Sequence, residues 1–285
     1  MQREQPLPDV SAAEGTGQAP WTERVAVAAD SSNRETGRAL AARLGLVFLD
    51  AELDRAANIA FILRVGADGL ALCSGAGRFG PISSEFATGR LRHRHQFGGG
   101  VGQSIARAVG IRQDTQLHIA DLTAGLGADA FVLAGLGARV SMIERHPVIA
   151  MLLEDGLRRG RELAQSTAIT DALSRMQLIH GEAMEWLRDG STAERPDVVY
   201  LDPMFPERGK SAQVRKEMQA LQQIVGGDDD ADSLLEPALT MAGYRVVVKR
   251  PRQAPPLAHR LPTFTVAGRS TRFDVYALRR MPSGP

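Results

Sequence analysis

The stretch of the sequence with the clearest chemical potential is an apolar run that ends in an acid, a proline and an aromatic. Residues 198–201 are apolar, β-rich and too few for a helix, so they predict a strand buried on both faces. Asp202 and Pro203 follow this strand directly, and Phe205 comes shortly after. Ligands of open parallel sheets bind at the carboxyl ends of the strands. We therefore expect these side chains to face a substrate, although Asp and Pro also occur together in ordinary turns.

These residue types suit a reaction on the exocyclic amine of a nucleobase. Such an amine is a poor nucleophile because its lone pair is delocalised into the ring, and acceptors on its N–H bonds help to localise that pair. The Asp202 carboxylate and the Pro203 carbonyl oxygen are candidate catalytic acceptors, and Phe205 is a candidate to stack on the base for about 1–3 kcal/mol. The pattern resembles the (Asn/Asp)-Pro-Pro-(Tyr/Phe) signature of amino-group methyltransferases that act on nucleic acid, with Met204 in place of the second proline.

A glycine loop between a predicted strand and a predicted helix is shaped for a cofactor. Residues 117–123 predict the strand, Gly125 and Gly127 lie in the loop, and residues 128–134 predict the helix. Glycine suits this turn because a Cβ would block the approach of a cofactor to the N–H groups at the start of the helix. The next strand ends at Glu144, about 20 residues beyond the loop, where a carboxylate can accept both hydroxyls of a ribose.

Two cofactors compete for this loop. The glycines together with Ala130 also satisfy the dinucleotide fingerprint, which is a weak signal by itself. S-adenosylmethionine is favoured by Asp121, an acid in the first strand that can influence the ammonium end of its methionine. It is also favoured by a third predicted strand, residues 176–180, because Glu182 and Ala183 follow at a place where a polar residue can meet an adenine amine. The Asp-Pro-Met-Phe stretch has no counterpart in hydride chemistry.

The order of the predicted elements indicates an α/β fold. A fifth strand is predicted at residues 244–249, and the chain ends in a late hairpin of residues 263–266 and 273–278, as the methyltransferase variant of the doubly wound sheet does. We therefore expect a seven-stranded, doubly wound, Rossmann-like sheet of the class I methyltransferase type.

A smaller unit is predicted before this sheet. It consists of a strand, a helix, a strand and a hairpin, at residues 25–28, 33–44, 46–49, 60–65 and 69–73. The first residues are rich in Pro, Gly, Ala, Gln and Ser without a hydrophobic period, which is typical of disorder. The predicted division of the chain is a disordered leader at 1–22, a small N-terminal α+β module at 23–95 and a methyltransferase domain at 96–285.

Composition excludes several classes of protein. The 285 residues, 44% of them hydrophobic, suffice for a large α/β domain and a smaller one. A net charge of +1, from 34 basic and 33 acidic residues, means that any nucleic-acid surface must be a local patch. Cys73 is the single cysteine, which excludes an internal disulfide and a Cys-rich zinc site. No metal is expected, because His93 and His95 have no third ligand nearby, and the polar N-terminus and the lack of a membrane-length apolar run predict a cytoplasmic protein.

Basic residues near these motifs are the candidates for contacts with RNA phosphates. Arg92 and Arg94 precede a glycine cluster, Lys210 follows the Asp-Pro-Met-Phe stretch, and Lys249 and Arg250 end the fifth strand. Such side chains give affinity that does not depend on base sequence. The alternative is that they belong to a flexible linker and to solvated charged faces.

Several motifs together resemble one known family, that of the bacterial small-subunit ribosomal RNA guanine-N2 methyltransferase J. They are Asp121-Leu-Thr-Ala-Gly-Leu-Gly127, Glu144-Arg-His-Pro-Val148, Tyr200-Leu-Asp-Pro-Met-Phe-Pro206 and Val246-Val-Val-Lys-Arg-Pro251, and the resemblance extends from roughly residue 90 to the C-terminus. It implies cofactor contacts at Ala128 with Asp129, Glu144 with Arg145, Glu182 with Ala183, and Asp202. Ala128 and Gln96 depart from the family pattern, which has an arginine and a lysine there.

The resemblance implies an enzyme that transfers a methyl group from S-adenosylmethionine to the N2 amine of a guanine in 16S ribosomal RNA and releases S-adenosylhomocysteine. The implied partner of this monomer is small-subunit ribosomal RNA or the assembled small subunit. The residues themselves leave two alternatives open, an NAD(P)-dependent Rossmann oxidoreductase and a non-catalytic RNA-binding or assembly factor.

Overall fold

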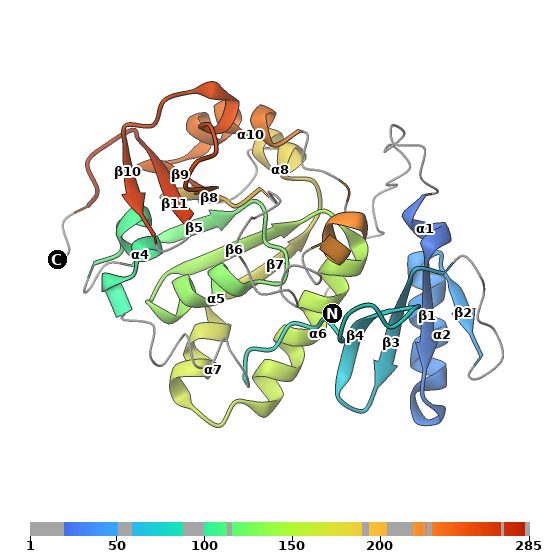
Figure 1. Cartoon of the computed structure of the whole chain (residues 1–285). Helices are drawn as coiled ribbons and strands as arrows, with labels where there is room; N and C mark the ends of the chain where they lie inside the picture. Colours follow the sequence, from blue (N-terminus) through green and yellow to red (C-terminus); the bar gives the residue numbers. More distant parts are fainter. Residues whose placement is uncertain are drawn as a thin grey trace.

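The computed structural model arranges the chain around two β-sheets. It describes residues 20–50, 59–87, 100–112, 116–189, 194–203, 219–224, 226, 230–268 and 271–282, and the structural statements below concern these residues. Figure 1 shows a large sheet covered by helices and a smaller sheet beside it. The predicted seven-stranded α/β sheet and the small N-terminal α+β unit are therefore confirmed.

The large sheet has the strand order β10-β11-β9-β8-β5-β6-β7. The strands from β9 to β7 are parallel to one another, and β11, which is antiparallel to β9, forms an antiparallel hairpin with β10 at one edge. β5 is the first strand of this sheet along the chain. β6 and β7 follow on one side of it, and the chain then crosses to β8 on the other side, so the topological switch point lies between β5 and β8. The bounds are β5 His118–Asp121, β6 Arg139–Glu144, β7 Met176–His180, β8 Val198–Leu201, β9 Arg245–Pro251, β10 Phe264–Ala267 and β11 Thr271–Ala277.

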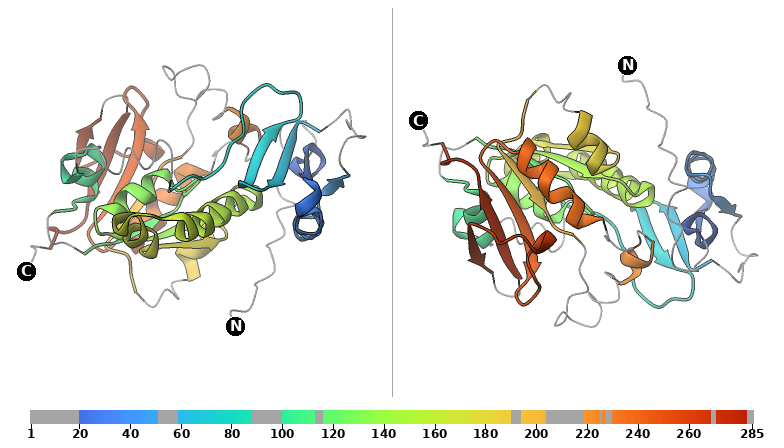
Figure 2. Two further views of the ribbon diagram at one scale, coloured as in Figure 1. Left: turned by 90° about the horizontal axis from the view of Figure 1, so that it is seen from below. Right: turned by 90° about the horizontal axis from the view of Figure 1, so that it is seen from above.

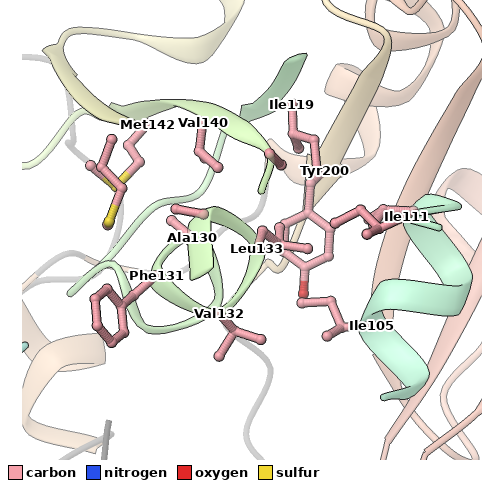
Figure 3. Close-up of a cluster of buried hydrophobic side chains, with 14 of the residues drawn as sticks. Ile105, Ile111, Ile119, Ala130, Phe131, Val132, Leu133, Val140, Met142 and Tyr200 are labelled. Carbon is pink, nitrogen blue, oxygen red and sulfur yellow. The ribbon is translucent and has the colours of Figure 1, made fainter. Parts of the chain in front are cut away.

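Alternate residues of the central strands face two separate cores. In β8, Val198 and Tyr200 pack on the side of α4, α5 and α7, whereas Val199 and Leu201 pack on the side of α8 and α10. Figure 3 shows Tyr200 among Ile105 of α4, Ile111 and Leu133 of α5. Burial on both faces explains why the strand is continuously apolar. The helix bounds are α4 Ser104–Val109, α5 Ala128–Gly135, α7 Thr167–Ser174, α8 Ala183–Asp189 and α10 Ala231–Met241.

The small sheet has the order β2-β1-β3-β4. β1 is parallel to β2 and β3, and β3 and β4 form the predicted hairpin, whose turn includes Gly69 at φ +99°. The left-handed φ explains why this turn has glycine. The bounds are β1 Val25–Ala29, α2 Arg34–Leu44, β2 Val47–Leu49, β3 Phe61–Gly66 and β4 Gly69–Ser74.

The predicted disordered leader extends too far along the chain. Residues 21 and 22 open a short helix, α1 (Trp21–Arg24). The Trp21 ring packs edge-on against the His146 ring with 4.9 Å between the centroids. The composition of the first residues concealed this contact, because a single tryptophan adds little to a local hydrophobic average. The predicted boundary at residue 95 lies outside the described residues.

A long helix, α6 (Pro147–Leu163), packs against both sheets and was not anticipated from the sequence. Its Leu153 and Leu157 belong to the core of the large sheet, whereas Val148 and Leu152 belong to the core of the small sheet. Figure 2 shows the helix extending from one sheet to the other. The two sheets therefore share a structural element and do not have independent cores.

Buried polar contacts fix α6 to the small sheet. Arg159 donates to Asp155 at 2.7 Å, to Glu85 at 2.8 Å and to the Ser84 carbonyl oxygen at 3.0 Å. Asp155 in turn accepts the N–H of Leu70, at the β3–β4 turn, at 2.9 Å. A buried arginine with several partners in fixed positions sets the orientation of the helix.

The close approach at this junction makes Gly156 a sensitive position. A Cβ there would lie 2.4 Å from the Ser84 Cβ and 2.6 Å from its carbonyl oxygen. Gly156→Ala should therefore lower the free energy of unfolding by about 1–3 kcal/mol, the usual cost of overpacking, although alanine is ordinarily the better helix former. Denaturant unfolding measures this change. Gly102→Ala is the control, because its Cβ would meet nothing within 4 Å; equal stability of the two variants would refute the tight junction.

Candidate active site

A pocket opens at the carboxyl edge of the large sheet, between the ends of its parallel strands and the start of α10. Its lining residues are Leu122, Thr123, Gly125, Ile143, Glu144, Arg145, Glu182, Ala183, Met184, Asp202, Asp230, Ala231 and Leu234. Among them are Gly125, Glu144, Arg145, Glu182, Ala183 and Asp202, all predicted to contact the cofactor. The parallel sheet gathers these residues, which are far apart in the sequence, because its strands end at one edge.

Glu144 ends β6 and holds the glycine loop in place. Its Oε2 accepts the N–H of Gly125 at 2.9 Å, and its Oε1 accepts the N–H of His146 at 2.8 Å. The residue is only 7% exposed. Gly125 has φ +54°, a left-handed conformation that would strain any residue with a Cβ. A carboxylate has about four lone-pair sites, so Glu144 can orient the loop and still accept hydroxyls.

The charge of the pocket suits a cationic cofactor. Glu144, Glu182, Asp202 and Asp230 line it against one basic residue, Arg145, whose guanidinium lies 2.8 Å from Asp230. Burial raises the pKa of Glu182, while the nearby Arg145 partly offsets that effect. The sulfonium and ammonium groups of S-adenosylmethionine are complementary to such a wall. The pyrophosphate of a dinucleotide would instead face several carboxylates, which disfavours the oxidoreductase reading of the glycine loop.

Gly127 and Ala128 do not line this pocket. Gly127 precedes α5 with φ +76°, and a Cβ there would lie 2.8 Å from Leu153 Cδ1 and 3.1 Å from Phe86 Cζ. The glycine is thus required for packing against α6 and its surroundings. Of the two loop glycines, Gly125 is the one that lines the pocket.

Asp121 lies beneath the pocket and reaches it through Thr123. Its Oδ1 accepts the Thr123 N–H at 3.1 Å, and the Thr123 Oγ1 accepts the Asp202 N–H at 2.6 Å. Burial raises the pKa of Asp121 to about 8, helped by the neighbouring Asp129 and Asp202 carboxylates. Asp121 is therefore mostly protonated near neutral pH, and Thr123 links the ends of β5 and β8.

Asp129, another predicted cofactor contact, is not among the residues that line the pocket. Its Oδ2 accepts the Tyr200 hydroxyl at 2.8 Å and the Lys249 ammonium at 2.7 Å. Lys249 also donates to Asp202 Oδ2 at 2.6 Å. Burial disfavours the charged ammonium, but the two carboxylates outweigh this effect and raise the pKa of Lys249. Burial and the adjacent Asp129 raise the pKa of Tyr200, which keeps its hydroxyl a donor.

A contact with RNA phosphate requires a side chain on the surface, and the structure does not place Lys249 and Arg250 in a surface patch. Lys249 is engaged by the two aspartates, and Arg250 is only 4% exposed, with its guanidinium donating to the Pro255 carbonyl oxygen at 2.6 and 3.0 Å. Both belong to a parallel strand in which successive side chains enter the cores of the two faces. The other predicted contacts to RNA or to the base, Phe205, Arg92, Arg94 and Lys210, lie outside the described residues.

Some polar residues of the site were not assigned there from sequence. Thr123 and Asp230 line the pocket, and Tyr200 and Lys249 bind the aspartates next to it. Lys249 had a usable signal, since a lysine that follows three apolar residues within a strand must find a buried partner or reach solvent. Thr123 and Tyr200 adjoin recognised motifs. Asp230 had no local signal, because only the position of α10 beside the sheet brings it to Arg145.

The described part of the chain was also searched for metal sites and for membrane-spanning helices. It contains no cluster of three metal-ligating side chains. Among the helices that it includes, none is long and apolar enough to span a bilayer.

Glu144→Ala should weaken S-adenosylmethionine binding by about 1.5–3 kcal/mol, the usual range for a hydrogen bond to a charged group. The loss has two sources, the missing acceptor for the cofactor and the release of the Gly125 N–H that shapes the loop. Glu144→Gln keeps one acceptor oxygen and should lose less. Titration calorimetry measures the affinities, and Glu154→Gln, which alters an exposed carboxylate on α6, is the control. Wild-type affinity in folded Glu144→Ala would remove the residue from the cofactor site.

Comparisons with known proteins identify the family of the chain. The model of a family described as "Putative SAM-dependent methyltransferase" matches residues 47–278. A Saccharophagus degradans protein named ribosomal RNA small subunit methyltransferase J is 53% identical over 204 residues, which are 70% of this chain and 76% of that protein. A Colwellia psychrerythraea protein of the same name is 45% identical over 256 residues, 89% of this chain and 92% of its own length.

A solved structure is similar over nearly the same length. The crystal structure of a SAM-dependent methyltransferase from Neisseria gonorrhoeae has 33% sequence identity and a TM-score of 0.68, and the match covers 88% of this chain and 95% of that one. The family match begins at residue 47, so it includes most of the small sheet, which the sequence motifs had left out. The chain belongs to the S-adenosylmethionine-dependent methyltransferases, in the family of ribosomal RNA small subunit methyltransferase J.

Proposed function

We propose that this enzyme methylates the exocyclic N2 amine of a guanine in small-subunit ribosomal RNA. The observation that carries the proposal is the position of Asp202, at the carboxyl end of β8 and on the wall of a pocket whose charge suits S-adenosylmethionine. The names of the relatives support ribosomal RNA as the substrate. The residue types of the Asp-Pro-Met-Phe stretch support the exocyclic amine of guanine as the group that is methylated.

The residues of the site contribute mainly positioning. When bound, S-adenosylmethionine would supply the methyl group, with its sulfur–methyl bond breaking as the bond to guanine N2 forms, the sulfur keeping the electron pair and the N2 proton passing to water. Asp202 and the Pro203 carbonyl oxygen accept N–H bonds of the amine, which directs its lone pair. Correct placement of two reactants can lower a barrier by roughly 7–11 kcal/mol. Phe205 is proposed to stack on the guanine.

A basic surface is proposed to hold the RNA backbone. It consists of Arg92, Arg94 and Lys210, all outside the described residues, and the low net charge makes such a local patch necessary. The enzyme is further proposed to act as a monomer in the cytoplasm, where ribosomal subunits are assembled. A non-catalytic RNA-binding role is the outcome that remains if no methyl group is transferred.

Asp202→Asn should reduce methyl transfer by orders of magnitude, because the amide keeps the shape and one acceptor oxygen but loses the charge that polarises the amine. S-adenosylmethionine affinity should fall much less. The measurement is single-turnover methylation of small-subunit RNA or assembled subunits, with the product identified as N2-methylguanosine by nucleoside mass spectrometry. Near-normal turnover in this variant, or a methyl group on a ring nitrogen, a ribose or protein, would show that the proposed chemistry is wrong.

RNA affinity should fall steeply as salt rises, since each phosphate contact releases counterions. Removing the charges of Arg92, Arg94 and Lys210 together should weaken binding and flatten the dependence of log affinity on log salt. Filter binding across a salt series measures both. Arg38→Met, which removes an exposed charge on α2, is the control, and an unchanged slope in the triple variant would dismiss the patch.

A further inference from the structure

Lys249 connects Asp129, which does not line the pocket, with Asp202, which does. It projects from β9, and its ammonium lies 2.6 Å from Asp202 Oδ2 and 2.7 Å from Asp129 Oδ2. The Tyr200 hydroxyl donates to the same Asp129 oxygen at 2.8 Å. Two strands of the large sheet, β8 and β9, and the helix α5 therefore meet at one ammonium group.

Asp129 and Tyr200, which hold one side of the Lys249 ammonium, are both buried. Asp129 is buried in the first turn of α5, and Tyr200 is fully buried within β8. The Lys249 side chain is only 21% exposed. A lysine with freely rotating bonds is a poor positioning group, but here one side of its ammonium is fixed by buried partners, so the direction toward Asp202 is fixed as well.

Asp202 needs a cation at this place because of its other neighbours. The Asp129 carboxylate binds the same ammonium, and the carboxyl group of Asp121 is close enough to interact with both aspartates. Like charges in a poorly solvated site raise the pKa of a carboxylate, and a nearby cation lowers it. Without Lys249, Asp202 would tend to take up a proton or turn toward water, and it would lose its strength as an acceptor in either case.

We infer that Lys249, anchored by Asp129 and Tyr200, is a positioning residue that holds the Asp202 carboxylate ionised and aimed for methyl transfer. The inference rests on the proposed function. It replaces the predicted contact between Lys249 and RNA phosphate, because the ammonium is held by two carboxylates on a side chain that is mostly buried. Lys249 does not touch the reacting atoms and acts through Asp202.

The test compares Lys249→Met with wild type in single-turnover methylation at saturating RNA and S-adenosylmethionine. The methyl-transfer rate should fall at least tenfold, while the calorimetric Kd for S-adenosylmethionine changes less than threefold. The acid limb of the pH–rate profile should move to higher pH, because Asp202 loses its cation while Asp129, Asp121 and the Tyr200 hydroxyl remain around it. A structural role alone would leave this limb in place. Arg38→Met is again the matched control, as it removes an exposed cation that pairs with Asp50 at 2.9 Å.

A second variant keeps the test decisive if Lys249→Met does not fold. The double variant Lys249→Met with Asp129→Asn removes one of the uncompensated carboxylates, and it should fold yet remain at least tenfold slow, because Asp202 still lacks its partner. A near-wild-type rate with an unmoved acid limb in a folded variant would overturn the inference. So would a loss confined to RNA affinity, with a normal rate at saturation, since that result assigns Lys249 to phosphate binding. Failure of the wild type to form N2-methylguanosine would instead refute the proposed function.

Discussion

The compensation of buried negative charge beneath the pocket is the constraint on which the site depends. Asp121, Asp129 and Asp202 converge there, and isolated carboxylates cannot be withdrawn from water without partners. The structure meets this requirement in different ways: burial raises the pKa of Asp121 to about 8 so that it tends to hold a proton, whereas Asp129 and Asp202 share the Lys249 ammonium. The Thr123 N–H donates to Asp121 Oδ1, and the Tyr200 hydroxyl donates to Asp129 Oδ2 beside the ammonium.

Strand order makes this compensation possible. β8 pairs with β5 on one side and with β9 on the other, and Tyr200 stands opposite both Asp121 and Val247 in the register. Asp202 and Lys249 therefore emerge side by side, one position beyond Leu201 and Val248. A shift of one residue in either pairing would send the lysine to the opposite face of the sheet. The antiparallel β11 and β10 protect the far edge of β9 and keep this register in place.

The pocket also depends on contacts far from it. α6 begins within the motif that contains Glu144 and packs against both sheets, so the position of β6 is tied to the small N-terminal sheet. The His146 N–H that Glu144 binds precedes the first turn of this helix. The small sheet is thus part of the framework that holds the cofactor side of the pocket, and the family match includes most of it.

The sequence by itself determined the strands, the glycine loop and the residues that end the strands. Apolar runs and glycines report local backbone geometry, and parallel strands must present their carboxyl ends at one edge, so Gly125, Glu144 and Asp202 were expected at that edge, where they line the pocket. Motif resemblance supplied the family. Only the tertiary structure decided that Asp129 faces Lys249 and that Asp230 reaches Arg145. Those contacts depend on which strand lies beside which and on where a helix starts against the sheet, and no local pattern encodes them.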